Sequence, residues 1–137
     1  MARLHVVAVS ARLPAWAEAA CADYSRRMPK GYEVSRIAVK DDARLKKSLS
    51  GLNQARIVAL DERGKDMTTA QFCALLRVET VFVVGGPDGL SAEIKENAKL
   101  LLRLSSLTLP HALAQVLLIE QIYRAATLLA GHPYHRS

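Results

Sequence analysis

Short apolar runs alternate with helix-like segments along the chain, and this alternation constrains the fold more than any other feature. The runs expected to form buried strands are residues 4–9, 33–39, 56–60, 81–84 and 100–107. The run at 81–84 (VFVV) is apolar throughout, as a central strand of a parallel sheet is. Strands that alternate with helices predict an α/β fold, in which helices flank both faces of a parallel sheet.

Residues that favour helix ends mark the segments between the strands. The expected helix starts are Pro14, Thr68, Ser91 and Pro110, and Thr68 is spaced to form a capping box with Gln71. Gly131 is expected to end the last helix. Residues 61–65 (DERGK) are predicted to form a turn, and the charged segment 41–52 a helix or a loop.

The composition is that of one globular domain spanning residues 1–137. Half of the residues are hydrophobic but only 5% are aromatic, so the core must be built from aliphatic side chains. The net charge of +6 favours a polyanionic partner such as nucleic acid. His5, Ser10 and Arg12 interrupt the first apolar stretch and no run is long enough to span a membrane, so a cytoplasmic protein without membrane binding is expected.

Cys21 and Cys73 each lie in an apolar, helix-like segment. They form no Cys-x-x-Cys or Cys/His spacing of the kind that zinc sites require. Two buried free thiols in a reducing compartment are therefore expected, and no metal site is expected.

The last expected helix, between Pro110 and Gly131, carries apolar residues on more than one face. A surface helix needs only one apolar face, so this helix is expected to be covered twice, by the sheet and by a second subunit. The alternative is the central helix of a monomer. On the remaining polar face, Glu120 and Arg124 are spaced to form an ion pair.

Three strand ends are candidates for a ligand site, because open α/β sheets bind ligands at the carboxyl ends of their strands. They lie at residues 60–65, 85–89 and 107–111. The glycines of 85–89 (GGPDG) would let a ligand approach the backbone, but the loop has neither dinucleotide-fingerprint nor P-loop spacing, so a simple tight turn is the alternative. Residues 104–109 (LSSLTL) carry no charge and suit a flat heterocycle such as adenine, with ordinary strand packing as the alternative.

The C-terminal residues His132, Tyr134, His135 and Arg136 gather two imidazoles, a phenol and a guanidinium in one short segment. Chain ends of soluble domains are more often disordered and rich in Lys, Glu and Ser. The groups in this tail suit proton transfer, base stacking and phosphate contact.

Taken in order, several motifs resemble those of one family. They are Pro14-x-Trp16, Leu60-Asp61-x-x-Gly64-Lys65, Gly85-Gly86-Pro87-Asp88-Gly89-Leu90-Ser91, Leu107-Thr108-Leu109-Pro110-His111, Tyr123-Arg124-Ala125 and His132-Pro133-Tyr134-His135-Arg136. Over its whole length the chain resembles the ribosomal RNA large subunit methyltransferase H family, a minimal group of SPOUT methyltransferases. The resemblance implies a homodimer, and a parallel α/β sheet whose C-terminal part threads into a trefoil knot.

The resemblance also implies an activity and its residues. The family transfers the methyl group of S-adenosylmethionine to N3 of pseudouridine-1915 in 23S rRNA, acting on the assembled ribosome. Its cofactor-binding positions correspond here to Leu60, Gly85, Leu104, Ser105, Ser106, Leu107, Thr108 and Leu109. The expected catalytic and RNA-contacting positions are His132, Tyr134, His135 and Arg136, with a tail histidine as the general base and His111 as a further candidate.

The chain departs from the family pattern at two places. Gln115 stands where family members carry an arginine, which removes an expected phosphate or cofactor contact, and the connections near residues 40–50 and 77–78 are shorter than usual. A non-catalytic ribosome- or RNA-binding module on a SPOUT scaffold is therefore the alternative function. Besides the tail, RNA contact is expected from the basic residues Arg26, Arg27, Lys30, Arg44, Lys46 and Lys47.

Overall fold

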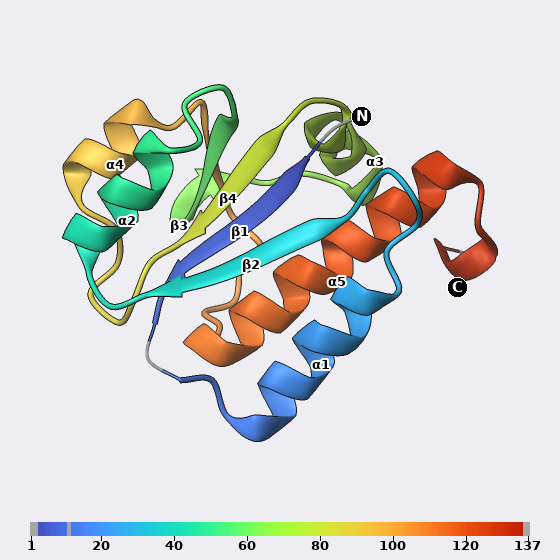
Figure 1. Cartoon of the computed structure of the whole chain (residues 1–137), viewed down its shortest axis with the longest axis horizontal. Coiled ribbons are helices and arrows are strands. Elements are labelled where there is room, and N and C mark those ends of the chain that lie inside the picture. Colours follow the sequence, from blue (N-terminus) through green and yellow to red (C-terminus); the bar gives the residue numbers. More distant parts are fainter. Residues whose placement is uncertain (1–2, 11, 136–137) are drawn as a thin grey trace.

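Five parallel strands form one sheet in the order β2-β1-β4-β3-β5 (Figure 1). The structure is a computed structural model that describes residues 3–10 and 12–135. Its strands are β1 (Leu4–Val9), β2 (Val34–Val39), β3 (Arg56–Lys65), β4 (Thr80–Val84) and β5 (Leu100–Leu102). The middle strand, β4, is buried at all five residues, as its continuously apolar sequence predicts.

Helices cover both faces of this sheet, as the alternation of elements predicts (Figure 1). On one face, Val6 and Phe82 contact a layer made of α1 (Ala15–Arg26), α3 (Thr69–Phe72), the 3₁₀ helix η1 (Cys73–Arg77) and α5 (His111–Ala130). On the other face, Val7 and Val83 contact α2 (Asp42–Ser50) and α4 (Ala92–Asn97). Because side chains alternate along a strand, β1 and β4 contribute to both hydrophobic cores.

The long helix α5 lies against the sheet beside α1, with Leu118 and Ile122 fully inside the core. By length and composition α5 could also span a membrane, but its contacts are those of a core helix. Gly131 ends it in the left-handed conformation at φ 78°, and Glu120 and Arg124 form the predicted ion pair at 2.9 Å. The covering of α5 by a second subunit stays a prediction.

Two predicted boundaries are wrong, at the ends of β3 and β5, and both lie at the carboxyl edge of the sheet. Residues 61–65 do not form a turn but continue β3 through a register shift, so that Leu60 and Lys65 both pair with Leu102. The fifth strand ends at Leu102 instead of residue 107, because its only partner is β3 and the regular pairing stops at this shift. Residues 103–109 are therefore released as a loop.

The third helix is shorter than predicted, although its predicted start is confirmed. Thr68 and Gln71 form the capping box, with hydrogen bonds of 3.1 and 2.9 Å in the two directions. The α-helix stops at Phe72 and continues as η1, whose tighter turns place Leu75 and Leu76 in the core within a short connection to β4.

Cys21 and Cys73 are buried free thiols, as expected. Burial raises the pKa of both thiols, which keeps them protonated and unreactive. Within residues 3–10 and 12–135, no three metal-binding side chains gather in one place. The trefoil knot implied by the family resemblance stays a prediction.

Candidate functional site

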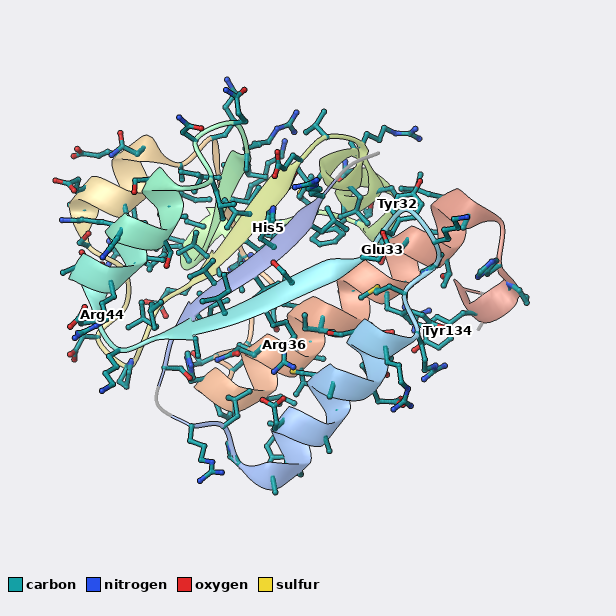
Figure 2. All side chains as sticks on the ribbon, viewed as in Figure 1. His5, Tyr32, Glu33, Arg36, Arg44 and Tyr134 are labelled. Carbon is teal, nitrogen blue, oxygen red and sulfur yellow. The ribbon has the colours of Figure 1, made fainter. Side chains whose placement is uncertain are left out.

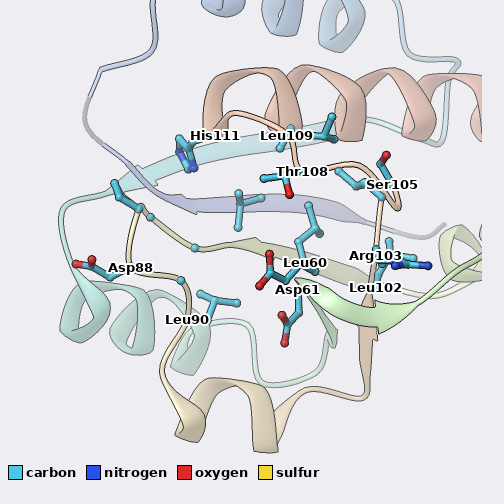
Figure 3. Close-up of a pocket in the computed structure, with 18 of the residues that line it drawn as sticks. Leu60, Asp61, Asp88, Leu90, Leu102, Arg103, Ser105, Thr108, Leu109 and His111 are labelled. Carbon is cyan, nitrogen blue, oxygen red and sulfur yellow. The ribbon is translucent and has the colours of Figure 1, made fainter.

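A pocket of about 520 Å³ opens at the carboxyl edge of the sheet, where β3, β4 and β5 end and α5 begins (Figure 3). Its volume falls in the range that small-molecule sites occupy. The walls come from the three candidate strand ends: residues 60–62, the loop 85–90, and the segment that leads from β5 to His111. The fold therefore joins into one site the segments that the sequence singled out separately.

Most of the predicted cofactor-binding residues line this pocket. They are Leu60, Gly85, Leu104, Ser105, Leu107, Thr108 and Leu109. Ser106 is not among the lining residues. Leu107 is 75% exposed at the pocket, so its large apolar side chain is available to cover a bound molecule. The contact of each residue with a cofactor stays a prediction.

The glycine loop shapes one wall of the pocket with its backbone. A Cβ atom on Gly85 would lie 2.8 Å from the carbonyl carbon of Gly89 and 2.9 Å from the amide nitrogen of Leu90, so no side chain fits there. The amide of Gly89, which has φ 76°, donates to the carbonyl of Gly86 at 2.9 Å. The loop is thus the tight turn named as the alternative, and it also forms part of the site.

Charged side chains at the pocket are held by partners that the sequence did not indicate. The carboxylate of Asp61 is only 11% exposed and pairs with Lys95 of α4 at 3.3 Å. At the rim, Arg103 donates two hydrogen bonds to Asp66, which lower the pKa of that carboxyl group. Both pairs join segments that are distant in the chain, so only the packing of α4 and β5 against β3 reveals them.

Gln115, which replaces the arginine of the family pattern, is buried beside His111. It is 5% exposed, and its Nε2 lies 2.7 Å from Nε2 of His111. Burial lowers the pKa of His111, although a hydrogen bond to the Gly85 backbone acts in the opposite direction, so the ring is neutral at pH 7. A neutral ring has one N–H group. Because the amide nitrogen of Gln115 can only donate, Nε2 of His111 accepts and the hydrogen of the neutral ring lies on Nδ1.

This pairing predicts the effect of Gln115→Leu, which keeps the volume of the side chain but removes the amide. The His111 ring is expected to change its tautomer, because Nε2 loses its donor. The affinity for S-adenosylmethionine should fall by about 2- to 10-fold, the equivalent of one hydrogen bond. Nitrogen NMR of the ring reports the tautomer, and calorimetry reports the affinity. Gln121→Leu on the same helix is the control, and an unchanged ring in Gln115→Leu would contradict the assignment.

The tail is fixed at the opposite end of α5 by an aromatic and charged cluster (Figure 2). The hydroxyl of Tyr134 donates to Glu120 at 3.0 Å and lies 3.4 Å from the hydroxyl of Tyr24. Its ring meets the edge of Tyr123, with centroids 4.5 Å apart, and the guanidinium of Arg124 lies 5.2 Å from its centre. The tail is therefore anchored on α1 and α5.

Tyr134 is a proton donor in this cluster and not a base. Burial raises the pKa of Tyr134, and the hydrogen bonds to Tyr24 and Glu120 raise it further. His132 is exposed, and its amide donates to the carbonyl of Thr127 at 2.8 Å. The side chain of His135 and all of Arg136 lie outside the described part of the chain, so their roles stay predictions.

Within one chain, the structure does not bring the tail to the pocket. The helix α5 has 20 residues, begins with His111 at the pocket and ends beside the tail. At 1.5 Å per residue it is about 30 Å long. The predicted cofactor residues are thus gathered at one end of α5, and His132 and Tyr134 of the predicted catalytic residues lie at the other.

The profile of the family described as "Predicted SPOUT methyltransferase" matches residues 2–135 of the chain. The chain belongs to the SPOUT methyltransferase family. Curated SPOUT relatives named ribosomal RNA large subunit methyltransferase H include those of Verminephrobacter eiseniae, 46% identical over 153 positions, and Burkholderia mallei, 41% identical over 155 positions. Each alignment covers 98% of the chain and 99% of the relative, which confirms the resemblance. Both alignments exceed the 137 residues of the chain, so the relatives carry segments that it lacks.

Solved structures show the same SPOUT fold. A Bacillus anthracis protein for which RNA methyltransferase activity has been proposed has a TM-score of 0.61 at 18% identity, covering 90% of the chain and 94% of that protein. The SpoU methyltransferase AviRb from Streptomyces viridochromogenes, solved with its cofactor AdoMet, has a TM-score of 0.53 at 11% identity. That match covers 96% of the chain and 58% of AviRb. The fold class predicted from the sequence is confirmed.

Proposed function

We propose that the protein methylates N3 of a pseudouridine in 23S rRNA with S-adenosylmethionine, acting on the assembled ribosome. The observation that carries this proposal is the pocket, which is built from the same three segments that hold the family motifs. Relatives at 41–46% identity over nearly the whole chain bear the name of a ribosomal RNA methyltransferase. An assembled ribosome as the substrate implies a cytoplasmic protein.

The pocket fits S-adenosylmethionine in size and in chemistry. Leu60, Leu104 and Leu109 offer aliphatic surfaces for the adenine ring, and the side-chain-free wall at Gly85 leaves room for close backbone contact. When bound, the cofactor supplies an activated methyl group. The residues of the chain hold it in place and exclude water.

The proposed active unit is a homodimer in which the tail of one subunit completes the pocket of the other. The length of α5 separates the two halves of the site within one chain, so a second copy is needed to bring them together. Apolar side chains are available for such a contact: Trp16 of α1 is 56% exposed, and Leu113 and Leu117 of α5 are only partly buried.

The proposed mechanism assigns a proton-transfer role to the tail. The N3–H group of an imide is a poor nucleophile until it loses its proton, so a base that titrates near neutral pH accelerates the transfer. His135, or His132 in its place, is the proposed base, because histidine titrates in this range. Tyr134, which is held protonated by its surroundings, orients the base or the nucleotide, and Arg136 contacts phosphate.

A non-catalytic ribosome-binding module on the same scaffold is the second candidate, favoured by the loss of the family arginine at Gln115. Such a module would not need to bind the cofactor, whereas the enzyme must. The position of Gln115 argues for the enzyme, since this residue supports His111 at the pocket and leaves the pocket itself open.

Calorimetry with S-adenosylmethionine separates these candidates, and it is expected to show one binding site per chain. Mass spectrometry of 23S rRNA from a strain that lacks the protein is expected to show the loss of N3-methylpseudouridine. Binding without loss of the modified base would contradict the proposed substrate. The absence of any binding would favour the non-catalytic module.

A further inference from the structure

Internal ion pairs occupy most of the basic residues that the sequence suggested for RNA contact. The pairs are Arg26 and Arg27 with Asp23, Arg44 with Asp41, and Lys46 with both Asp42 and Glu93. A cation that already neighbours a carboxylate attracts phosphate less strongly, because the two opposite charges cancel at a distance. The excess positive charge of the chain, +6, must therefore come from other basic residues on the surface.

Four cations without such partners follow one another along the amino edge of the sheet. They are Arg3, Arg77, Arg56 and Lys99, named here the amino-edge row. Arg3 precedes β1 and its carbonyl accepts from Thr80 at 3.0 Å, while the amides of Arg56 and Lys99 donate to Glu79 and Ile57, each at 2.8 Å. The row thus follows the strand order β1-β4-β3-β5, with Arg77 just before β4, over about 14 Å at the usual strand spacing.

The side chains of this row are available to a partner. Arg3, Arg77 and Lys99 are exposed, and Arg56 is half-buried. Among the described residues, none of the four makes a side-chain hydrogen bond or an ion pair. The nearby carboxylate of Glu79 lies 3.0 Å from Nε2 of His5, and the four cations outnumber its single negative charge. The amino edge therefore keeps a local excess of positive charge.

A strand of nucleic acid fits this row better than a compact anion does. The cations form a line instead of converging on one point, and described aromatic rings able to stack on bases are absent from the row itself, which favours contact with the phosphate backbone. Figure 1 shows that β1 begins toward the end of α5 that carries the C-terminal tail, whereas β3 and β5 begin farther from it, beside α2 and α4. RNA that follows the row of one subunit would pass beside the tail of that subunit.

We infer that the amino-edge row binds the phosphate backbone of the rRNA. The bound RNA would then place the target nucleotide near the tail of the same subunit, which in the proposed dimer lies at the pocket of the partner subunit. This inference rests on the proposed function, since the rRNA is the substrate of the proposed methylation. It replaces the RNA surface expected from the sequence with a different one on the same chain.

The test is the double variant Arg56→Gln/Lys99→Gln, measured with ribosomes from cells that lack the protein. Ribosome affinity is expected to fall about tenfold or more at physiological salt, and the slope of log K against log salt to become shallower by about 2. The KM for ribosomes should rise by a similar factor, while kcat at saturating ribosomes and the affinity for S-adenosylmethionine stay unchanged.

Lys40→Gln/Arg44→Gln is the matched control, because it removes the same charge from exposed residues at the far end of β2 and on α2, where Arg44 already pairs with Asp41. It is expected to change the salt slope by much less. If the two double variants changed ribosome affinity and its salt dependence equally, the inference would be overturned, because the effect would then come from net charge alone. This test can fail independently of the proposed function. A wild-type protein that neither binds the cofactor nor methylates would disprove the proposed function. The salt dependence of ribosome binding would still show whether the amino-edge row contacts RNA.

Discussion

Two variants that are inactive alone are expected to restore methylation when they are combined in one dimer. In Gly85→Val, the Cβ alone would lie 2.8 Å from the carbonyl carbon of Gly89, so the larger side chain is expected to close the pocket. His135→Ala removes the proposed base, whose loss should lower kcat by about 10²- to 10⁴-fold. A heterodimer of the two variants contains one intact pocket facing one intact tail. An equal mixture of exchanged subunits should therefore recover about a quarter of the wild-type activity.

The control for this experiment mixes Gly85→Val with the double variant Gly85→Val/His135→Ala. That mixture contains no intact pocket and is expected to stay inactive. The affinity of His135→Ala for S-adenosylmethionine should match that of the wild type, because the proposed base acts on the nucleotide, whereas the strand ends and loops line the cofactor pocket. Heterodimers that form but show no activity would disprove the shared site, and normal turnover by His135→Ala would disprove the base assignment.

Gly64→Ala is expected to lower the free energy of unfolding by about 1–3 kcal/mol, a large fraction of the stability of a domain of this size. The added Cβ would lie 2.7 Å from the carbonyl carbon and oxygen of Leu101 and from the carbonyl carbon of Leu102. These atoms belong to the backbone of β5, so no side-chain rotation can relieve the clash. Because β5 leads into the pocket wall, the affinity for S-adenosylmethionine should fall as well. Urea denaturation and calorimetry measure the two effects.

Gly51→Ala is the matched control for this prediction. Gly51 follows α2 with φ −78°, and a Cβ there would meet only the carbonyl oxygen of Ser48, at an ordinary 3.5 Å. This substitution should be neutral or should stabilise the protein by up to about 1 kcal/mol, because alanine restricts the unfolded chain. Equal destabilisation by the two variants would show that the close approach of β3 and β5 has no energetic consequence.

The local sequence predicts most of the fold, because the signals that it contains act over a few residues. The strand β1 coincides with its prediction, and β4 and α5 lie within one residue of theirs. Thr68 and Ser91 cap their helices as expected. The two caps depend on a hydrogen bond to a backbone group three residues away. The strands and α5 follow from an apolar pattern that repeats within one element.

Local sequence patterns fail to predict strand boundaries and charge surroundings where contacts with a neighbouring strand or helix decide them. Residues 61–65 contain turn-forming residues but continue β3, because β5 offers a second pairing at Leu102 after the register shift. The leucine-rich segment after β5 predicts a longer strand, yet the regular ladder ends with β3 at Leu60. The basic residue Lys46 suggested an RNA surface, but the packing of α4 beside α2 places it 2.9 Å from the carboxylate of Glu93.

By itself, the sequence determined the α/β class, the four predicted helix starts and, through motifs spread along the whole chain, the SPOUT family. Only the tertiary structure decided that the three strand ends form one pocket, that Gln115 supports His111, and that four cations form a row along the amino edge. It also decided that the tail lies at the other end of α5. The reason is that helix caps and apolar periodicity act between near neighbours in the chain, whereas a pocket, a charge surface and a shared site depend on groups that meet only after packing.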